Sequence, residues 1–189
     1  MIIDNSYFTG KLEIPNLSND DQYINNNATL DQTILEYEFQ YLKAALGFKV
    51  AKDVINAVGA NGQITGSQKY KDLIDGLNDW IGLRYEINGV KYSQIANYVY
   101  CQYLLENQTQ LTESGNSLAQ FEKGSVLSSW NKFNIAWQAM IKERQTYDCD
   151  YHYLYDNRGY ITLHEYLSKS DDWDVSNFEV WRNTNKLGI

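Results

Sequence analysis

The sequence has few cysteines and none of the common catalytic motifs. Only Cys101 and Cys149 occur in 189 residues, and they do not form a C-x-x-C pair. A zinc site and a disulfide framework are therefore not expected, and the chain suits a reducing cytoplasm. There is no G-x-S-x-G, G-x-x-x-x-G-K-[ST] or G-x-G-x-x-G motif. Their absence argues against the common hydrolases, P-loop proteins and dinucleotide-binding proteins.

Long apolar runs and clusters of basic residues are also missing. No stretch approaches the ~18 apolar residues of a membrane span, and the N-terminus lacks the basic and apolar regions of a signal peptide. We expect a protein that stays inside the cell that makes it, or inside a particle assembled there. The formal net charge is −8, without a Lys/Arg cluster. Nucleic acids and anionic membranes both attract basic surfaces, so specific binding to either is not expected.

Side-chain pairs suited to catalysis are equally scarce. Cys149 and His152 are three residues apart, but the acidic residues around them would raise the pKa of a thiol rather than activate it. Paired carboxylates such as Glu36 and Glu38 are typical of solvated helix faces. We therefore expect no enzymatic activity and no cofactor.

Aromatic residues, in contrast, are abundant. The chain is 43% hydrophobic and 21% charged, which is typical of a globular protein, and it contains 16 Tyr, 6 Phe and 5 Trp. Tyr and Trp are enriched where a surface meets a partner, because they bury a large area and keep a polar group. The many Tyr, Asn, Ile and Lys equally fit an AT-rich coding bias.

The spacing of apolar residues predicts a mainly α fold. We expect a helical bundle around one long helix in the C-terminal half, with a small β-hairpin and extended N- and C-terminal arms. Residues 1–28, which hold the only proline, would be an extended arm, either floppy or pinned by a neighbour. Residues 29–167 would be the helical domain, and residues 168–189 a C-terminal tail.

Local signals place the elements of this domain. Helices are expected at about 30–46, 49–58, 68–77, 94–106, 126–154 and 163–167. Asn88-Gly89 favours a type I′ hairpin turn within 84–92, and Ser93 is a suitable N-cap for the helix that follows. This helix would bury Tyr92, Ala96, Val99, Tyr100 and Tyr103. The Ser/Thr-rich residues 107–124 would be a long loop or a β-like excursion.

Two of the predicted helices carry long apolar stripes. In the first, Leu35, Phe39, Leu42 and Leu46 form a stripe with Leu30, Ile34, Tyr37 and Tyr41 beside it, and so broad a face suits packing on two neighbours. The longest stripe consists of Val126, Trp130, Phe133, Trp137, Met140, Arg144, Tyr147, Tyr151 and Leu154. It predicts one helix about 40–45 Å long, with an aromatic spine that packs on shorter helices.

One segment partly matches an EF-hand calcium loop. Gly159 would make the sharp turn, and Asp156 and Glu165 would be ligands. The first and fifth ligand positions hold Leu154 and Arg158, which argues against calcium, and the alternative is a corner between helices whose glycine makes the bend. Asp148 and His152 share one helix face, which is also metal-ligand geometry. A small calcium- or metal-responsive helical regulatory protein is therefore an alternative function.

The order of these features resembles a known family. It runs from a Tyr37-Glu38 helix that closes at Leu46-Gly47, through Trp80-Ile81-Gly82-Leu83, Tyr98-Val99-Tyr100 and a Thr109/Thr112/Gly115 excursion, to Ala136-Trp137-x-x-Met140 in a long helix. This layout resembles the head–tail connector (adaptor, or head-completion) proteins of tailed bacteriophages, over roughly residues 30–155.

The resemblance implies a structural protein of the virion, assembled in the cytoplasm of the host. Its subunits would form a ring that joins the portal protein to tail-side proteins, without a cofactor, and an acidic surface would let DNA pass without binding. Apolar residues in the short end segments are then candidates for contacts between subunits. These interface candidates are Tyr7, Phe8, Trp173, Phe178 and Trp181. Equally, these five side chains could fold back onto the helices of their own chain.

Overall fold

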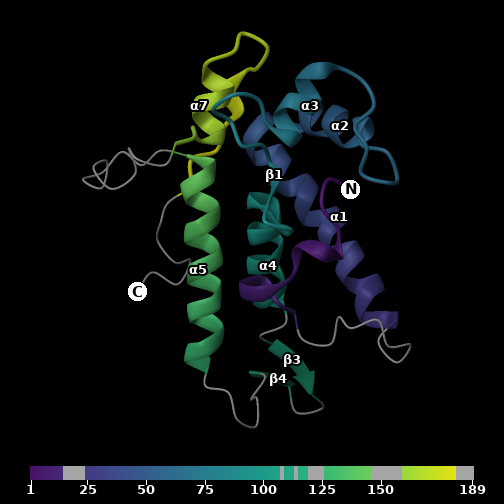
Figure 1. Cartoon of the computed structure of the whole chain (residues 1–189). Coiled ribbons are helices and arrows are strands. Elements are labelled where there is room, and N and C mark those ends of the chain that lie inside the picture. Colours follow the sequence, from purple (N-terminus) through teal and green to yellow (C-terminus); the bar gives the residue numbers. More distant parts are fainter. Residues whose placement is uncertain (15–23, 107–108, 113–114, 119–125, 146–158, 182–189) are drawn as a thin grey trace, which may run out of the picture.

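The computed structural model describes residues 1–14, 24–106, 109–112, 115–118, 126–145 and 159–181. They form a mainly helical fold with small antiparallel hairpins, as the periodicity predicts (Figure 1). The elements are α1 (Ile24–Leu46), α2 (Phe48–Ala57), α3 (Gln68–Asp75), β1 (Arg84–Ile87), β2 (Val90–Ser93), α4 (Gln94–Glu106), β3 (Thr109–Thr112), β4 (Gly115–Leu118), α5 (Val126–Arg144) and α7 (Leu163–Ser168). Short 3-10 turns are η1 (Asn5–Tyr7), η2 (Gly10–Leu12) and η4 (Val175–Asn177).

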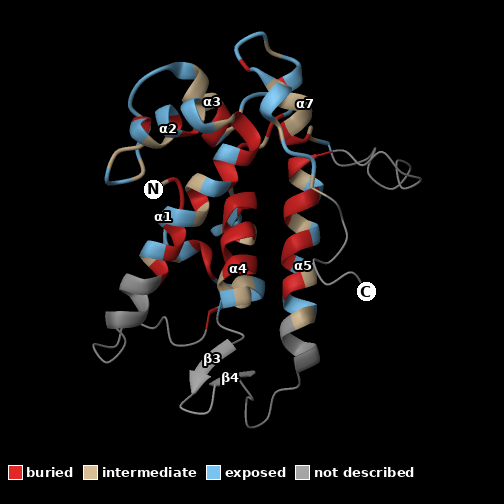
Figure 2. Ribbon diagram, turned by 180° about the vertical axis from the view of Figure 1, so that it is seen from behind, coloured by how far each residue is buried: buried red, intermediate tan, exposed pale blue. Residues whose placement is uncertain are grey.

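Helix α4 is the centre of the molecule. It lies between α1 and α5 and packs on both, while α2, α3 and α7 gather at one end (Figure 1). Figure 2 shows α4 as almost wholly buried, whereas α1 and α5 alternate between buried and exposed residues. A helix that is apolar on nearly all sides belongs in such a central position. No helix in the described ranges is both long and apolar enough to cross a bilayer.

Helix α1 packs on α2 and α4, in agreement with its broad apolar face. It ends at Leu46, as predicted, and is followed by Gly47, whose positive φ of 76° favours glycine. One member of the predicted stripe is wrong, however, because Leu35 is 51% exposed. The predicted residues Leu30, Ile34, Tyr41, Leu42 and Leu46 are buried in the core, together with Ala45. Two neighbouring helices therefore do not cover the whole apolar face of α1.

The predicted hairpin forms with the predicted turn. Asn88 and Gly89 have φ angles of 53° and 78°, and a type I′ turn requires positive φ at both positions. Ser93 Oγ accepts hydrogen bonds from the backbone N–H groups of Ile95 and Ala96, so it caps α4 as expected. The prediction that Tyr92 is buried is wrong. This residue belongs to β2 rather than to α4, and its exposed ring stacks on Tyr85 across the hairpin. Strands β3 and β4 form a second hairpin within the predicted excursion.

The prediction of one helix through Leu154 is wrong, because α5 ends at Arg144 and Gln145 is not helical. The other three positions of the stripe, at 147, 151 and 154, lie outside the described residues. Arg144 and Gln145, the last residues described at this end, are both buried. They bind the C-terminal segment there, as described below.

The described ends of the chain lie on the helical body. Ile2, Ile3 and Ile14 belong to the core, and the N-terminal segment runs across α1, α4 and the first hairpin (Figure 1). Helix α7 forms where a short helix is predicted, and residues 173–181 return from it toward α1 and α5. Both ends thus add side chains to the core.

Candidate functional site

The C-terminal residue described here, Trp181, is inserted between two helices. Its indole stacks on Tyr98 of α4 and on Trp137 of α5, with ring centroids 5.0 and 5.8 Å away. Tyr41 of α1 meets the same indole edge-on at 5.7 Å. Phe133 continues the stack beyond Trp137, so the predicted aromatic spine of α5 is extended by a residue from the tail. We call Tyr41, Tyr98, Trp137, Arg144 and Gln145 the aromatic slot, and residues 175–181 the strap.

The backbone of the strap is held at alternate residues. The Glu179 N–H donates to the Ala44 carbonyl at 2.8 Å, and Arg144 Nη2 donates to the Glu179 carbonyl at 3.1 Å. Gln145 binds both main-chain groups of Trp181, because Nε2 donates to its carbonyl at 2.6 Å and Oε1 accepts from its N–H at 2.9 Å. Val180, which lies between them, is 70% exposed. Such contacts recognise an extended peptide through its main chain.

Arg144 is the charged centre of the slot. It is fully buried, and its guanidinium carbon lies 3.9 Å from the ring centroid of Trp181, 4.6 Å from that of Phe178 and 4.8 Å from that of Tyr41. Besides the Glu179 carbonyl, Nη2 donates to the Ala44 carbonyl at 3.0 Å. Nε and Nη1 have no hydrogen-bond partner within the described part of the chain. Buried charges are normally paired, so the slot has an excess of positive charge and two unused donors.

The side chains that pack directly on the Arg144 guanidinium are aromatic. The Tyr41 hydroxyl donates to Gln94 Oε1, and burial raises the pKa of Tyr41 to about 12 although Arg144 opposes this shift. The indole N–H of Trp137 is also buried without an acceptor among the described residues. Aromatic walls and spare donors together suit a ligand with an apolar group and an acceptor.

A second buried charge holds the N-terminal segment. Glu38 Oε2 accepts hydrogen bonds from the backbone N–H groups of Ile2 at 2.8 Å and Ile3 at 3.2 Å. Glu38 is fully buried, so the prediction of a solvated carboxylate at this position is wrong. Burial raises the pKa of Glu38, while the two backbone N–H groups and the nearby positive charges oppose this shift. Sequence reasoning missed this residue because its partners are 35 and 36 positions away.

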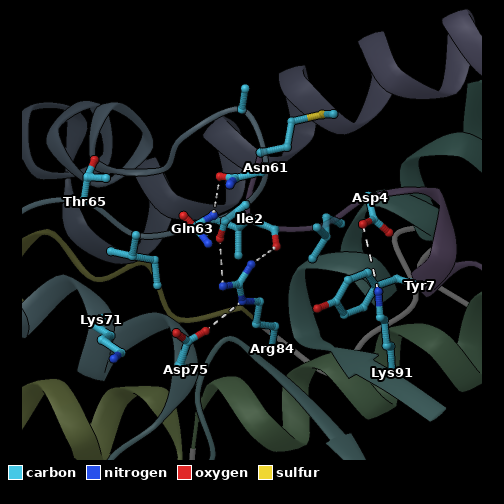
Figure 3. A pocket seen from close by; sticks show the side chains of 15 residues that line it. Ile2, Asp4, Tyr7, Asn61, Gln63, Thr65, Lys71, Asp75, Arg84 and Lys91 are labelled. Carbon is cyan, nitrogen blue, oxygen red and sulfur yellow. Dashed lines mark hydrogen bonds and ion pairs between the residues drawn. The ribbon is translucent and has the colours of Figure 1, made fainter. Parts of the chain in front are cut away.

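Beside this segment lies an open pocket of about 720 Å³ (Figure 3). Arg84 lines it and links the N-terminal segment to two other parts of the chain. Its Nη1 donates to the Ile2 carbonyl at 2.8 Å, Nη2 to the Gly62 carbonyl at 3.0 Å, and Nε to Asp75 at 2.8 Å. The other carboxylate of the lining, Asp4, accepts from Ser6. These charged groups attach the N-terminal segment to the body.

The five interface candidates all contact their own chain. Tyr7, Phe8 and Trp173 are buried, and Phe178 and Trp181 are half-buried against the core. They became candidates because apolar residues in short end segments were not expected to join a core, but these segments do pack on the core of their own chain. This packing corresponds to the alternative in which they fold back onto the helices. A contact with another subunit stays a prediction for each of them.

Of the two calcium candidates, only Glu165 lies within the described residues. Glu165 forms a capping box with Thr162, because its carboxylate accepts from the Thr162 N–H while the Thr162 hydroxyl accepts from the Glu165 N–H. Gly159 has a φ of 72°, as a sharp turn needs. Asp156, Asp148 and His152 lie outside the described residues. The described ranges contain no group of three or more His, Cys, Asp or Glu side chains that could hold a metal ion.

Apolar side chains are exposed on α1 and the start of α2, here called the α1 edge, and on α5, here called the α5 edge. On the α1 edge, Leu35 and Phe48 are 51% and 61% exposed, and Phe48 packs edge-on against Phe39 with 5.6 Å between ring centroids. Leu35 and Phe39 share this edge, because residues four apart lie on one face of a helix. On the α5 edge, Ile135 is 52% exposed. Helix α4 separates the two edges (Figures 1 and 2).

Searches of protein-family models, curated proteins and solved structures found no match to this chain.

Proposed function

We propose that this protein is a structural subunit of a tailed-phage virion, of the head–tail connector type. Its copies would form a ring that joins the portal protein to tail-side proteins. The observation that supports this function best is the presence of exposed apolar side chains on two different edges of one helical layer.

A ring requires two different contact surfaces on each subunit. In a head-to-tail interface, one patch of a subunit meets another patch of the next, and the ring closes if the rotation allows. The α1 edge, with Leu35, Phe39 and Phe48, and the α5 edge, with Ile135, could be such a pair. Single exposed apolar residues are common on soluble proteins, but a contiguous group that includes two large side chains favours a partner.

The remaining properties agree with this role. A net charge of −8 would repel DNA that passes through a ring, and the protein would need no cofactor for an assembly function. The place of action would be the virion, after assembly in the host cytoplasm. The resemblance in helix order supplies the identity of the partners, the portal and the tail-side proteins.

Complementation between two edge variants would test the head-to-tail contact. Phe48→Lys places a charge on the α1 edge and Ile135→Lys on the α5 edge, and Leu77→Lys is a matched control on an exposed apolar residue elsewhere. Each edge variant should weaken self-association by about tenfold or more, which corresponds to ~1.4 kcal/mol. A mixture of the two should form heterodimers, because each retains the edge that the other lacks. Light scattering and native mass spectrometry would measure both effects.

Two results would contradict the proposal. One is a wild-type chain that stays monomeric at all concentrations, both alone and with the portal protein of its own virus. The other is a symmetric dimer that either variant abolishes without rescue in the mixture.

A further inference from the structure

We infer that the aromatic slot is a docking site for an extended segment of a partner protein that carries an aromatic side chain next to a carboxylate. The strap, residues 175–181, is the occupant that this segment replaces. The inference stands on the geometry of the slot and does not depend on ring assembly.

The slot already binds a peptide in the described state. Gln145 and the Ala44 carbonyl bind main-chain groups, which every peptide has, so these contacts do not require the sequence of the strap. Side-chain recognition comes from the gap between Tyr98 and Trp137, which accepts a flat ring. An extended segment with one aromatic residue can therefore make the same contacts.

The strap satisfies the slot only in part. Arg144 Nε and Nη1 are buried and have no partner among the described residues, and guanidinium groups bind carboxylates through two parallel hydrogen bonds. The strap does contain a carboxylate, Glu179, but its side chain is exposed and Oε2 accepts from the Trp181 indole N–H at 3.4 Å. In the sequence, the residue after Trp181 is Arg182, a cation. A segment with a carboxylate beside the aromatic residue would complement Arg144 better.

The strap is built to be replaceable. Apart from the short turn η4 it has no regular secondary structure, and Ser176, Asn177, Glu179 and Val180 are exposed. It is connected to α7 through a turn that includes Ser170 and Asp172, so it can leave without unfolding a helix. Segments with few buried contacts open at a lower free energy than the core.

Peptide binding to the full-length Trp181→Ala variant would test the inference. This variant empties the aromatic gap and keeps Arg144, and circular dichroism would check that it is folded. Phe178→Ala is a second variant that weakens the strap if the first does not fold. The probes are three synthetic peptides of residues 175–183: the native sequence, Arg182→Asp, and Arg182→Asp with Trp181→Ala. Isothermal titration calorimetry would measure their Kd values.

The expected order of affinity identifies the roles of the ring and of the charge. The Arg182→Asp peptide should bind about tenfold or more tightly than the native peptide, and the peptide without Trp should not bind measurably. Adding Arg144→Gln to the protein should remove the difference between the first two peptides without abolishing their binding. Wild-type protein, whose strap competes, should bind the acidic peptide more weakly than the Trp181→Ala variant.

Other results would overturn the inference. If no peptide binds to either folded variant, the strap contacts are purely intramolecular. If the native peptide binds as tightly as the acidic one, the slot takes the strap of a second copy and does not select a carboxylate. A preference for the acidic peptide that persists in Arg144→Gln would show that the selected charge does not meet Arg144.

Discussion

The N-terminal segment and the strap are held by buried side chains of opposite charge. At the N-terminal end, the carboxylate of Glu38 accepts from two backbone N–H groups. At the C-terminal end, the guanidinium of Arg144 donates to two backbone carbonyls. The carboxylate therefore binds N–H groups and the guanidinium binds carbonyl groups. In the described part of the chain, Glu38 Oε1 and the Nε and Nη1 of Arg144 have no hydrogen-bond partner.

The two ends differ in what surrounds the charge. Ile2 and Ile3 are fully buried beside Glu38, and Arg84 ties this segment to the loop before α3 and to Asp75. The strap is held by two half-buried rings, Phe178 and Trp181, and by main-chain hydrogen bonds, while the side chains between them are exposed. The N-terminal segment is thus part of the core, whereas the strap behaves as a bound peptide. Hydrogen bonds between a buried charge and the backbone therefore fix the N-terminal segment permanently, whereas in the strap they hold a segment that can be exchanged.

Ile3→Ala should have the largest effect on stability. Removing a fully buried Ile side chain leaves a cavity, and such changes cost about 2–5 kcal/mol. Urea denaturation should show a lower midpoint, with the whole protein still unfolding in one transition. A loss below about 1 kcal/mol would show that the N-terminal segment is not part of the core, and the contrast between the ends would disappear.

Trp181→Ala should have a smaller and more local effect. The indole is half-buried, so we expect a loss of about 1.5–3 kcal/mol, below that of a fully buried Trp. Limited proteolysis should then cut the chain after α7 while the body stays folded. Val180→Ala is the matched control, because this neighbouring side chain is exposed and its loss should change neither measurement. Equal sensitivity of both variants would contradict the insertion of Trp181.

The smallest effect should come from the ionisation of Glu38. Its folded-state pKa is raised by burial above the ordinary value of 4.5. The protonated form is therefore favoured in the folded state, and its contribution to stability is full below pH 4.5 and is lost as the pH rises through the folded-state pKa. Glu38→Gln keeps an acceptor for both N–H groups and should remove this slope.

Denaturation of wild type and Glu38→Gln between pH 4 and 8 would measure the difference. Asp4 and Asp174, whose pKa values are lowered by hydrogen bonds to Ser6 and Ser176, are present in both proteins and cancel. If the two proteins have parallel pH profiles, Glu38 does not titrate differently in the folded state.

Local signals in the sequence were sufficient for much of the fold. The Asn88-Gly89 turn, the Ser93 cap and the end of α1 at Gly47 each depend on a few adjacent residues, and each was predicted correctly. The exposure of Leu35 was not, because a helical stripe shows which residues share a face and not how far the neighbouring helices extend over it.

The candidate site could not be predicted from the sequence, for a different reason. Arg144 and Gln145 look like the continuation of an amphipathic helix, and their partners lie 35 to 100 positions away. Glu38 looks like a surface carboxylate until Ile2 and Ile3 are placed on it. The position of Trp181 in a short end segment made it a candidate for contact with another subunit, but no local pattern distinguishes an indole that enters its own core from one that enters another chain.

The parallel rings of Trp137 and Trp181 give the molecule an optical property. Their centroids are 5.8 Å apart, so we expect the excited states of the two indoles to couple and to contribute to the ultraviolet circular dichroism spectrum. The signal belongs to the pair and vanishes when either ring moves away. Departure of the strap can therefore be followed without any label, in real time, by light alone.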